Sequence, residues 1–392
     1  MREESSAVAT AVRSPSQRAM GMPRSAIREI MALAAGRSDV IHLEVGEPDV
    51  STPAFIIDAA FVAAREGWTK YSSNAGLPTL RKQVAEHVGR EWKRPVSAEN
   101  VIITTGAIGA LYSALMSILD AGDELLVPDP GWPNYAAIAH LAGAKAVRYL
   151  QPAERGFLPD TAEIERLITP KTKAIILNTP GNPSGAIFSR ELMGAIMDVA
   201  RRTGIYVVSD EIYEDLVFEG EHVSAGVFDM PDRTFVISGF SKSYSMTGWR
   251  IGWLICPPSL VSVASSLQEP VTSCASTIAQ KAGEGALNGD GSSVREFRDM
   301  FMRRRDIVVD VFGNTGLLPM VPAGAFYALI DIRRKGMDSL TFAKTFLAEH
   351  KTAVVPGITF GPACDGYVRV AFTIGDEELR EGLERLRRFI QS

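Results

Sequence analysis

Residues 238–252 have the sequence Ser-Gly-Phe-Ser-Lys-Ser-Tyr-Ser-Met-Thr-Gly-Trp-Arg-Ile-Gly, and an apolar run lies on each side of this stretch. The run from Thr234 predicts a buried strand that leads in, and the run from Ile251 predicts another that leads out. Between them Lys242 lies among small hydroxyl residues, with Arg250 eight positions later. Such groups favour an anion, phosphate above all, and the lysine is a candidate nucleophile toward a carbonyl compound. A solvated loop lysine and a surface arginine fit the stretch equally well, so residues elsewhere must distinguish the two.

The bulk composition is that of a globular protein with room for two hydrophobic cores. The chain has 392 residues, of which 46% are hydrophobic and 22% charged, and its net charge is −5. A net negative charge of this size does not indicate binding to nucleic acid or to an anionic membrane. No apolar run approaches the ~20 residues of a membrane-spanning helix, and the N-terminus lacks the apolar core of a secretory signal. We therefore expect a cytoplasmic protein without nucleic-acid or membrane partners.

The cysteines and histidines do not form a recognisable ligand pattern. The three cysteines, Cys256, Cys274 and Cys364, are far apart and odd in number, and the five histidines are scattered. This distribution argues against a disulfide framework and fits a reducing compartment. It also predicts that the protein holds no metal.

Strand and helix patterns alternate between residues 51 and 285. Continuous apolar runs predict strands that begin near residues 101, 124, 173, 206, 234 and 251, and helices are predicted at 106–119, 134–144 and 191–202. Apolar strands separated by helices are typical of a mostly parallel sheet covered on both faces. The pattern predicts an α/β fold with a large domain over residues 51–285.

The remaining segments do not show this regular alternation of strands and helices. Residues 286–392 combine a long charged helix at 294–311, short apolar strands near 325 and 367, and an amphipathic helix at 377–390. A helix from Ser25 and a short strand at 40–43 lie near the N-terminus. We expect residues 21–50 and 286–392 to form a smaller α+β domain, and residues 1–20, rich in Ser, Ala and Arg, to be a flexible arm.

Polar residues follow several of the predicted strands, at the edge where open parallel sheets bind ligands. The strand at 101 ends in Thr104-Thr-Gly-Ala-Ile-Gly, whose exposed amides open a helix and suit a phosphate. The strand at 173 ends in Asn178-Thr-Pro-Gly-Asn-Pro-Ser-Gly, a rigid turn that holds Asn182. The strand at 206 ends in Ser209-Asp-Glu-Ile-Tyr, where Asp210 either caps a helix or holds a cation or a protonated heterocycle. Ordinary turns and caps would explain each motif taken singly.

Taken together, the motifs resemble those of fold-type I, pyridoxal-phosphate-dependent aminotransferases of class I and II, beyond the N-terminal arm. The resemblance implies a seven-stranded sheet in the large domain and pyridoxal 5'-phosphate as cofactor. The motifs are Gly46-Glu-Pro-Asp, Tyr71 with Gly76-Leu-Pro-Thr-Leu-Arg, Thr105-Gly-Ala, Asn178-Thr-Pro-Gly-Asn-Pro-Ser-Gly, Ser209-Asp-Glu-Ile-Tyr, Ser241-Lys through Arg250, Pro356-Gly with Phe360-Gly, and Tyr367-Val-Arg.

The resemblance implies roles for residues around the cofactor ring. Lys242 would form the imine with the cofactor aldehyde and later move a proton at the substrate. Asp210 would pair with the pyridine nitrogen and keep it protonated, which makes the ring an electron sink. Asn182 and Tyr213 would hydrogen-bond the phenolic oxygen, and Trp132 would stack on the ring, with a core tryptophan as its alternative reading.

The resemblance also implies phosphate and substrate ligands. A neighbouring subunit of a homodimer would supply Tyr71, and the chain's own phosphate ligands would be Gly106, Ala107, Ile108, Ser241 and Arg250. Arg369 would bind the substrate α-carboxylate in a bidentate fork, helped by Gly46, Trp132 and Asn182. Two positions depart from the pattern of many relatives, because Ile108 and Gly239 stand where a polar side chain often lies. We expect somewhat weaker cofactor retention from these departures.

The predicted reaction is ping-pong transfer of an amino group from an L-amino acid to a 2-oxo acid. The same motifs serve a lyase, a racemase, a decarboxylase or an oxidase that uses this cofactor, so these remain alternatives. A cofactor-sensing transcription factor is disfavoured, because no basic DNA-binding domain precedes the fold. A non-catalytic scaffold is disfavoured by the presence of Lys242, Asp210 and Arg369. For a dicarboxylic substrate the only candidate cation was Arg37, chosen by proximity, and the sequence slightly favours a general or aromatic substrate.

Overall fold

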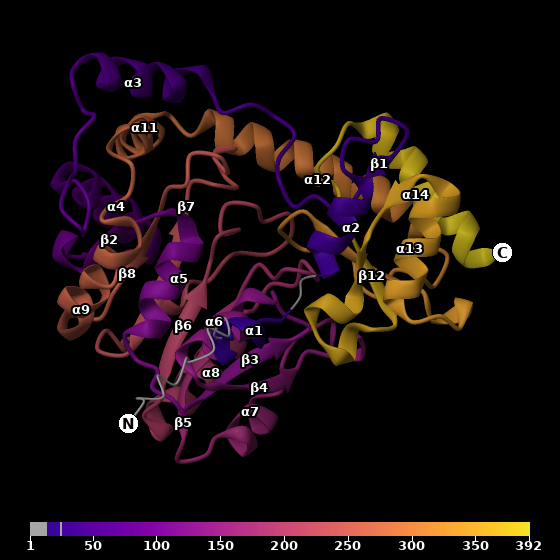
Figure 1. Ribbon diagram of the computed structural model, residues 1–392, viewed down its shortest axis with the longest axis horizontal. Coiled ribbons are helices and arrows are strands. Elements are labelled where there is room, and N and C mark those ends of the chain that lie inside the picture. Colours follow the sequence, from indigo (N-terminus) through magenta and orange to yellow (C-terminus); the bar gives the residue numbers. More distant parts are fainter. Residues whose placement is uncertain (1–13, 24–25) are drawn as a thin grey trace, which may run out of the picture.

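A computed structural model describes residues 14–23 and 26–392 of the chain, and a seven-stranded sheet lies at its centre (Figure 1). Neighbouring strands are parallel except β8, which is antiparallel to both of its neighbours. The prediction of a mostly parallel seven-stranded sheet is therefore confirmed. From edge to edge, the strands are β2 (Val101–Thr104), β8 (Gly252–Ile255), β7 (Thr234–Gly239), β6 (Tyr206–Asp210), β5 (Thr172–Asn178), β3 (Glu124–Asp129) and β4 (Lys145–Leu150).

Helices cover both faces of this sheet, which explains why its strands are continuously apolar. They are α3 (Ala54–Arg65), α4 (Pro78–Trp92), α5 (Gly106–Met116), α6 (Asn134–Ala142), α7 (Thr161–Leu167), α8 (Arg190–Thr203), α9 (Val261–Ser266), α10 (Glu269–Thr272) and α11 (Thr277–Asn288). Alternate strand residues, such as Ile102 and Phe235, pack with α5 and α6. The intervening residues, such as Ile103 and Val236, face α3, α4 and α11 near β2, and α7 and α8 cover the same face farther along.

One helix boundary in this region differs from the sequence prediction, and one strand runs against its neighbours. The helix predicted to reach Leu119 ends at Met116, and Ile118 and Leu119 remain buried in the turn that follows. Their burial gives the turn the apolar character of a helix. The strand β8 returns antiparallel because residues 240–251 form turns rather than the helical crossover that a parallel strand requires.

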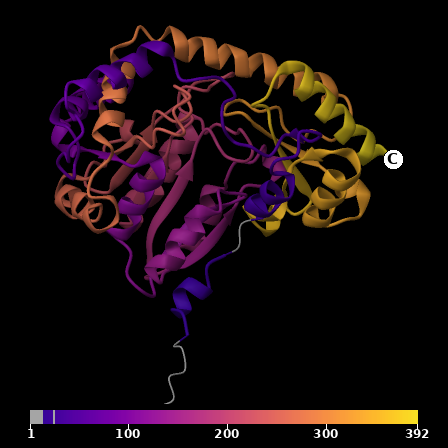
Figure 2. The same cartoon turned by 45° about the horizontal axis from the view of Figure 1, so that its top comes forward.

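The smaller part of the molecule is built from both ends of the chain. Its elements are α2 (Ala26–Ala34), β1 (Ile41–His42), α12 (Ser292–Phe312), β9 (Tyr327–Asp331), α13 (Ser339–His350), β10 (Thr352–Ala353), β11 (Val355–Pro356), β12 (Tyr367–Ala371) and α14 (Asp376–Gln391). Strands β11, β12 and β9 form an antiparallel sheet, and β1 pairs with β10 in parallel. A segment near the N-terminus thus lies beside a C-terminal strand. The long helix α12 runs from the large sheet region to this part (Figure 2).

An ion-pair cluster fastens the N-terminal segment to these C-terminal helices. The Arg304 guanidinium in α12 is buried, donates to both oxygens of Asp49 at 2.7 and 2.8 Å, and donates to Asp376 at 3.1 Å. Since Asp376 begins α14, one arginine joins three segments that are far apart in the sequence. We retain 21–50 and 286–392 as the proposed bounds of the small domain.

The predicted flexible arm lies mostly outside the described residues, which begin at residue 14. Within the described range, α1 (Gln17–Met20) is a short helix, and His140 lies 2.8 Å from the carbonyl oxygen of Arg18. No helix in residues 14–23 or 26–392 combines the length and the apolar character needed to cross a bilayer.

Two glycines allow β7, β8 and the start of α5 to pack backbone against backbone. A Cβ atom at Gly239 would lie 2.8 Å from the Cα of Gly252. A Cβ atom at Gly252 would lie 2.7 Å from the Ala107 nitrogen and 2.9 Å from the Ser238 oxygen. Gly239 is therefore explained by close packing, which leaves no room for the polar side chain that many relatives have there.

We predict that Gly252→Ala destabilises the protein by about 1–3 kcal/mol, because the added methyl group meets backbone atoms that cannot rotate away. Gly248→Ala is the matched control, since a Cβ there meets no atom within 4 Å; it should change the free energy of unfolding by less than about 0.5 kcal/mol. Denaturant unfolding curves of both variants give the comparison. Equal effects would contradict the assigned close packing.

Candidate active site

A cavity of about 480 Å³ lies where the carboxyl ends of β2, β5, β6 and β7 face the small domain. Its walls come from α2, the segment 44–47, the start of α5, the strand ends and β12. Eleven of the predicted site residues line it, namely Gly46, Ala107, Ile108, Trp132, Asn182, Asp210, Tyr213, Ser241, Lys242, Arg250 and Arg369. The fold thus brings together residues that are more than 300 positions apart in the sequence.

Lys242 follows β7 and extends into this cavity. Its Nζ atom donates a hydrogen bond to the carbonyl oxygen of Gly46 at 2.7 Å. Burial lowers the pKa of Lys242 to about 8; Glu47 opposes the decrease, whereas Arg369 and Arg250 add to it. More of the amine is therefore neutral near physiological pH than in an exposed lysine, and the neutral amine is the form needed by a nucleophile or a base.

Asp210 is the last residue of β6, and its carboxylate is buried in the floor of the cavity. Burial raises the pKa of Asp210 to about 6, while a hydrogen bond from the Tyr135 hydroxyl opposes the increase. This hydroxyl lies 2.8 Å from Oδ2, and the Ile212 amide donates to Oδ1 at 3.4 Å. The group is mostly ionised at pH 7, so a buried negative charge faces the cavity.

Arg369 in β12 is a buried cation without a carboxylate partner among the ion pairs of the described residues. Its guanidinium donates to the Asn182 side-chain oxygen at 3.2 Å and to the Glu44 carbonyl at 2.7 Å. Its Nε atom is buried with no hydrogen-bond partner in the described chain. The ring of Tyr327 lies 4.3 Å away. Burial lowers the pKa of Arg369, but an arginine remains charged, so an incoming carboxylate would satisfy it.

A second place for an anion lies at the start of α5. Gly106 opens this helix with a φ of 70°, and a Cβ atom there would lie 2.8 Å from Nη2 of Arg250. Arg250 itself has a φ of 55° and donates to the Thr247 carbonyl at 2.7 Å. The helix terminus, the arginine and the Ser241 hydroxyl all favour negative charge. Gly106 is therefore adjacent to the cavity although it does not line it.

Two sequence-predicted residues do not reach the cavity of this chain. Tyr71 is 87% exposed and lies outside the lining. Arg37 pairs with Asp39 at 3.1 Å at the surface and is not among the residues that line the cavity, so the described chain gives no support to its suggested contact with a distal carboxylate. Proximity in sequence misled here because the residues of α2 that line the cavity, Ile27, Arg28 and Met31, lie in its first two turns, whereas Arg37 lies beyond its end.

The model of the family described as aminotransferase class I and II matches residues 38–386. The chain belongs to the class I and II aminotransferases. It is 37% identical to the aspartate aminotransferase of Pyrococcus horikoshii, over 96% of this chain and 97% of that protein. It is 39% identical to the aspartate/prephenate aminotransferase of Thermus thermophilus, over 90% and 91%. The solved Thermus thermophilus aspartate aminotransferase with maleate has a TM-score of 0.92 and 38% identity, and the match covers 96% of this chain and 99% of that one.

Several residues of the aminotransferase site were missed by sequence reasoning. Tyr135, which hydrogen-bonds Asp210, lies three residues after Trp132 at the start of a predicted helix, where its aromatic ring gives no sign of this contact. Asn178 opens a quoted motif, and its side chain joins the Asn182 amide (2.8 Å) to the Asp210 carbonyl (3.0 Å). Tyr327 lies in an apolar strand, where a hydroxyl is the only signal, and it meets the Tyr213 hydroxyl at 3.0 Å.

We predict that Tyr135→Phe raises the pKa of Asp210 further, because the lost hydrogen bond stabilises the ionised carboxylate. Carboxyl-carbon NMR titration of the cofactor-free protein measures this directly. Tyr149→Phe is the control: it removes an equally buried hydroxyl that bonds the Ile176 carbonyl at 2.7 Å. If both variants leave the Asp210 titration in place, the assigned role of Tyr135 is wrong.

Proposed function

We propose that the protein is a pyridoxal-5'-phosphate-dependent aminotransferase that moves an amino group from an L-amino acid to a 2-oxo acid by a ping-pong mechanism. The observation that carries the proposal is the meeting of an amine, a buried carboxylate and a buried, unpaired guanidinium in one cavity, from Lys242, Asp210 and Arg369. Membership of the aminotransferases supplies the class of reaction.

The donor set of the cavity fits this cofactor. The ionised Asp210 is suited to a protonated pyridine nitrogen, and the place between the α5 start and Arg250 is suited to a phosphate. Lys242 is suited to the aldehyde, because part of its amine is unprotonated. When bound, the cofactor supplies an electron sink for the negative charge that develops at the substrate Cα.

The chain's own residues then have separate tasks. Lys242 would hold the cofactor and would move the proton at the substrate Cα. Asn182 and Tyr213 would donate to the cofactor's phenolic oxygen, and Trp132 would lie against its ring. Arg369 binds the substrate α-carboxylate through the donors that are incompletely satisfied in the cavity.

The cavity wall favours an amino acid with an apolar or aromatic side chain. Ile27 and Met31 from α2 line it, together with Ile108 and Trp132. A substrate side chain that packs against these groups would bury apolar surface, which stabilises binding by about 25 cal/mol per Å². Arg28 from the same helix also lines the cavity, and relatives named above are aspartate aminotransferases, so aspartate is the competing donor.

A donor screen against 2-oxoglutarate and pyruvate tests the proposal. We expect leucine, methionine or phenylalanine to outperform aspartate, with release of the donor's 2-oxo acid only when an acceptor is present. Release of ammonia without an acceptor would instead indicate a lyase or an oxidase.

Two substitutions separate the proposed tasks. Lys242→Ala is expected to abolish the visible absorbance of the bound cofactor and to lower kcat by at least roughly 10²- to 10⁴-fold, since it removes the general base. Arg369→Lys is expected mainly to raise KM for the amino donor, because an ammonium lacks the fork that binds a carboxylate at two points. Spectra and steady-state kinetics provide both measurements, and a Lys242→Ala protein with normal turnover would refute the assignment.

We propose that the active unit is a homodimer in which Tyr71 reaches the phosphate of the neighbouring site. In support, Tyr71 is largely exposed, and Phe61 and Val62 are exposed on α3. If the site is shared, mixing Lys242→Ala with Tyr71→Ala protein should give activity above the sum of the parents, since one hybrid site is complete. In the control, each parent is cross-linked before mixing, so that no hybrid dimer can form. A fully active monomer in sedimentation analysis would contradict the proposal.

A further inference from the structure

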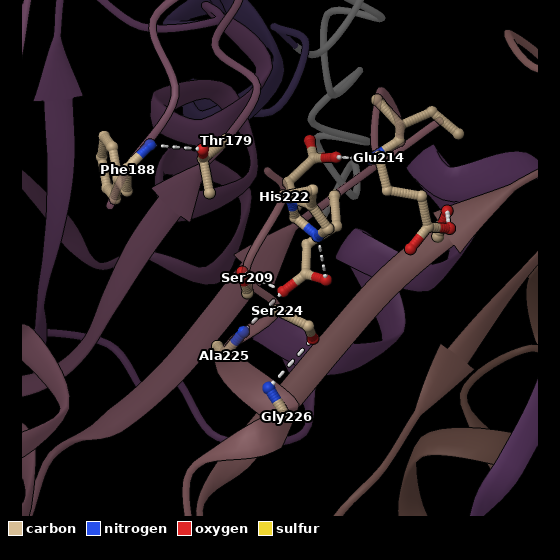
Figure 3. A network of polar contacts seen from close by, with 12 residues as sticks. Thr179, Phe188, Ser209, Glu214, His222, Ser224, Ala225 and Gly226 are labelled. Carbon is tan, nitrogen blue, oxygen red and sulfur yellow. Dashed lines mark hydrogen bonds and ion pairs between the residues drawn. The ribbon is translucent and has the colours of Figure 1, made fainter. Parts of the chain in front are cut away.

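A network of titratable groups begins at the residue after Asp210, and in it Glu211 is buried while Glu214 and His222 are half-buried. It consists of Glu211, Glu214 and His222, none of which lines the cavity. Figure 3 shows His222, Ser209, Ser224 and Ala225 gathered in one place beside the strands. Since Glu211 directly follows Asp210, whatever fixes this network also fixes the end of β6.

Glu211 is fully buried, and groups from separate segments satisfy its carboxylate. The Ser209 hydroxyl bonds Oε1 at 2.7 Å, the Ala225 amide bonds Oε1 at 2.9 Å, and His222 Nε2 lies 3.0 Å from Oε2. Burial opposes ionisation, but the charge and hydrogen bond of His222, with Ser209 and Ser224, outweigh it and lower the pKa of Glu211. Burial likewise opposes the charge on His222, but Glu211 raises the pKa of its imidazole. The two groups form a buried ion pair.

Glu214 lies one turn later, and its surroundings favour the neutral form of its carboxyl group, whereas those of Glu211 favour the ionised form. Its Oε1 is hydrogen-bonded to the hydroxyl of Ser238 in β7, the strand that leads to Lys242. The titratable groups around it are Asp215, Glu211, His222 and Tyr244, and the only cation among them already pairs with Glu211. Burial, followed by the charge of Asp215, raises the pKa of Glu214 to about 8. At pH 7 its carboxyl group is mostly neutral.

These contacts hold the Asp210 segment from two sides. Glu211 ties it to the loop at 222–226, while Glu214 and the Glu211 amide, which donates to the Ile237 carbonyl at 2.8 Å, tie it to β7. The charge of Glu211 also raises the pKa of Asp210, so its neutralisation by His222 affects how readily Asp210 stays ionised. Both position and charge of Asp210 therefore depend on the network.

We propose that Glu211, Glu214 and His222 are positioning residues for Asp210, with Glu211 acting as a carboxylate paired to His222 and Glu214 as a neutral carboxylic acid. The inference rests on the proposed function, because Asp210 is the residue that would meet the cofactor. Two neighbouring glutamates thus have different protonation states, and isosteric glutamine substitutions must affect them differently.

The first arm of the test uses Glu211→Gln, His222→Gln and the double variant. Each single variant should lower the unfolding temperature at pH 7. The double variant should lower the free energy of unfolding by less than the sum of the two single effects, because the ion pair is lost only once. In Glu211→Gln, removal of the nearby charge should lower the pKa of Asp210, seen by carboxyl NMR in the cofactor-free protein. The acid limb of the kcat/KM profile should move in the same direction. An unmoved Asp210 titration together with additive losses would overturn the proposal.

The second arm uses Glu214→Gln, which imitates the neutral acid and should keep kcat/KM at pH 7. A carboxyl group whose folded pKa is raised contributes stability below its unfolded pKa, and this contribution is lost as pH rises through the folded pKa. The wild type should therefore lose stability relative to Glu214→Gln from about pH 4.5 to about pH 8, after which the difference stays constant. A variant that becomes relatively less stable as pH rises would show that Glu214 is ionised, and would overturn its part in the proposal.

Both arms can be measured without catalysis. The Asp210 titration and the unfolding curves use cofactor-free protein, so failure of the donor screen would refute the proposed function while leaving these readouts intact. Conversely, an active transaminase with an unchanged Asp210 titration in Glu211→Gln would refute the positioning role alone.

Discussion

The buried carboxylate of Asp210 is the constraint on which the site depends. Burial of a charge is costly, and Asp210 stays mostly ionised at pH 7 because the Tyr135 hydroxyl and the Ile212 amide donate to it. The first donor belongs to helix α6, and the second lies two residues beyond the end of β6. The sheet order, which places β5 and β7 on either side of β6, then sets Asn182 and Lys242 around the same charge. The charges that line the cavity are therefore only partly paired with one another, which is typical of a binding site.

The sequence was sufficient for the fold class and for most of the residues that line the cavity. Continuous apolar strands separated by helices predicted the mostly parallel sheet, and polar residues at strand ends predicted the edge at which the cavity lies. These patterns do not give the direction of each strand or the distances between side chains. The antiparallel course of β8 depends on the turns of residues 240–251, and Tyr135 differs from a core aromatic residue only through its contact with Asp210. Arg37 shows the reverse error, because closeness in sequence to α2 does not place its side chain in the cavity.

The two ends of the chain contribute to the cavity as much as its middle does. The segment 44–47 accepts hydrogen bonds from both Lys242 and Arg369, through the carbonyls of Gly46 and Glu44. Arg304 fastens the following residue Asp49 to α12 and α14. The cavity is therefore lined by residues from both ends and the middle of the chain, and helix α2 adds one of its walls.

The glycine contacts described for β7, β8 and α5 also bear on motion. At Gly239 and Gly252, main chain meets main chain with no side chain between them, so no rotamer change can alter the spacing. The start of α5 and the segment that carries Lys242 are consequently expected to fluctuate as one rigid body. We therefore expect the Lys242 side of the cavity to be stiffer than the side formed by β12, which carries Arg369.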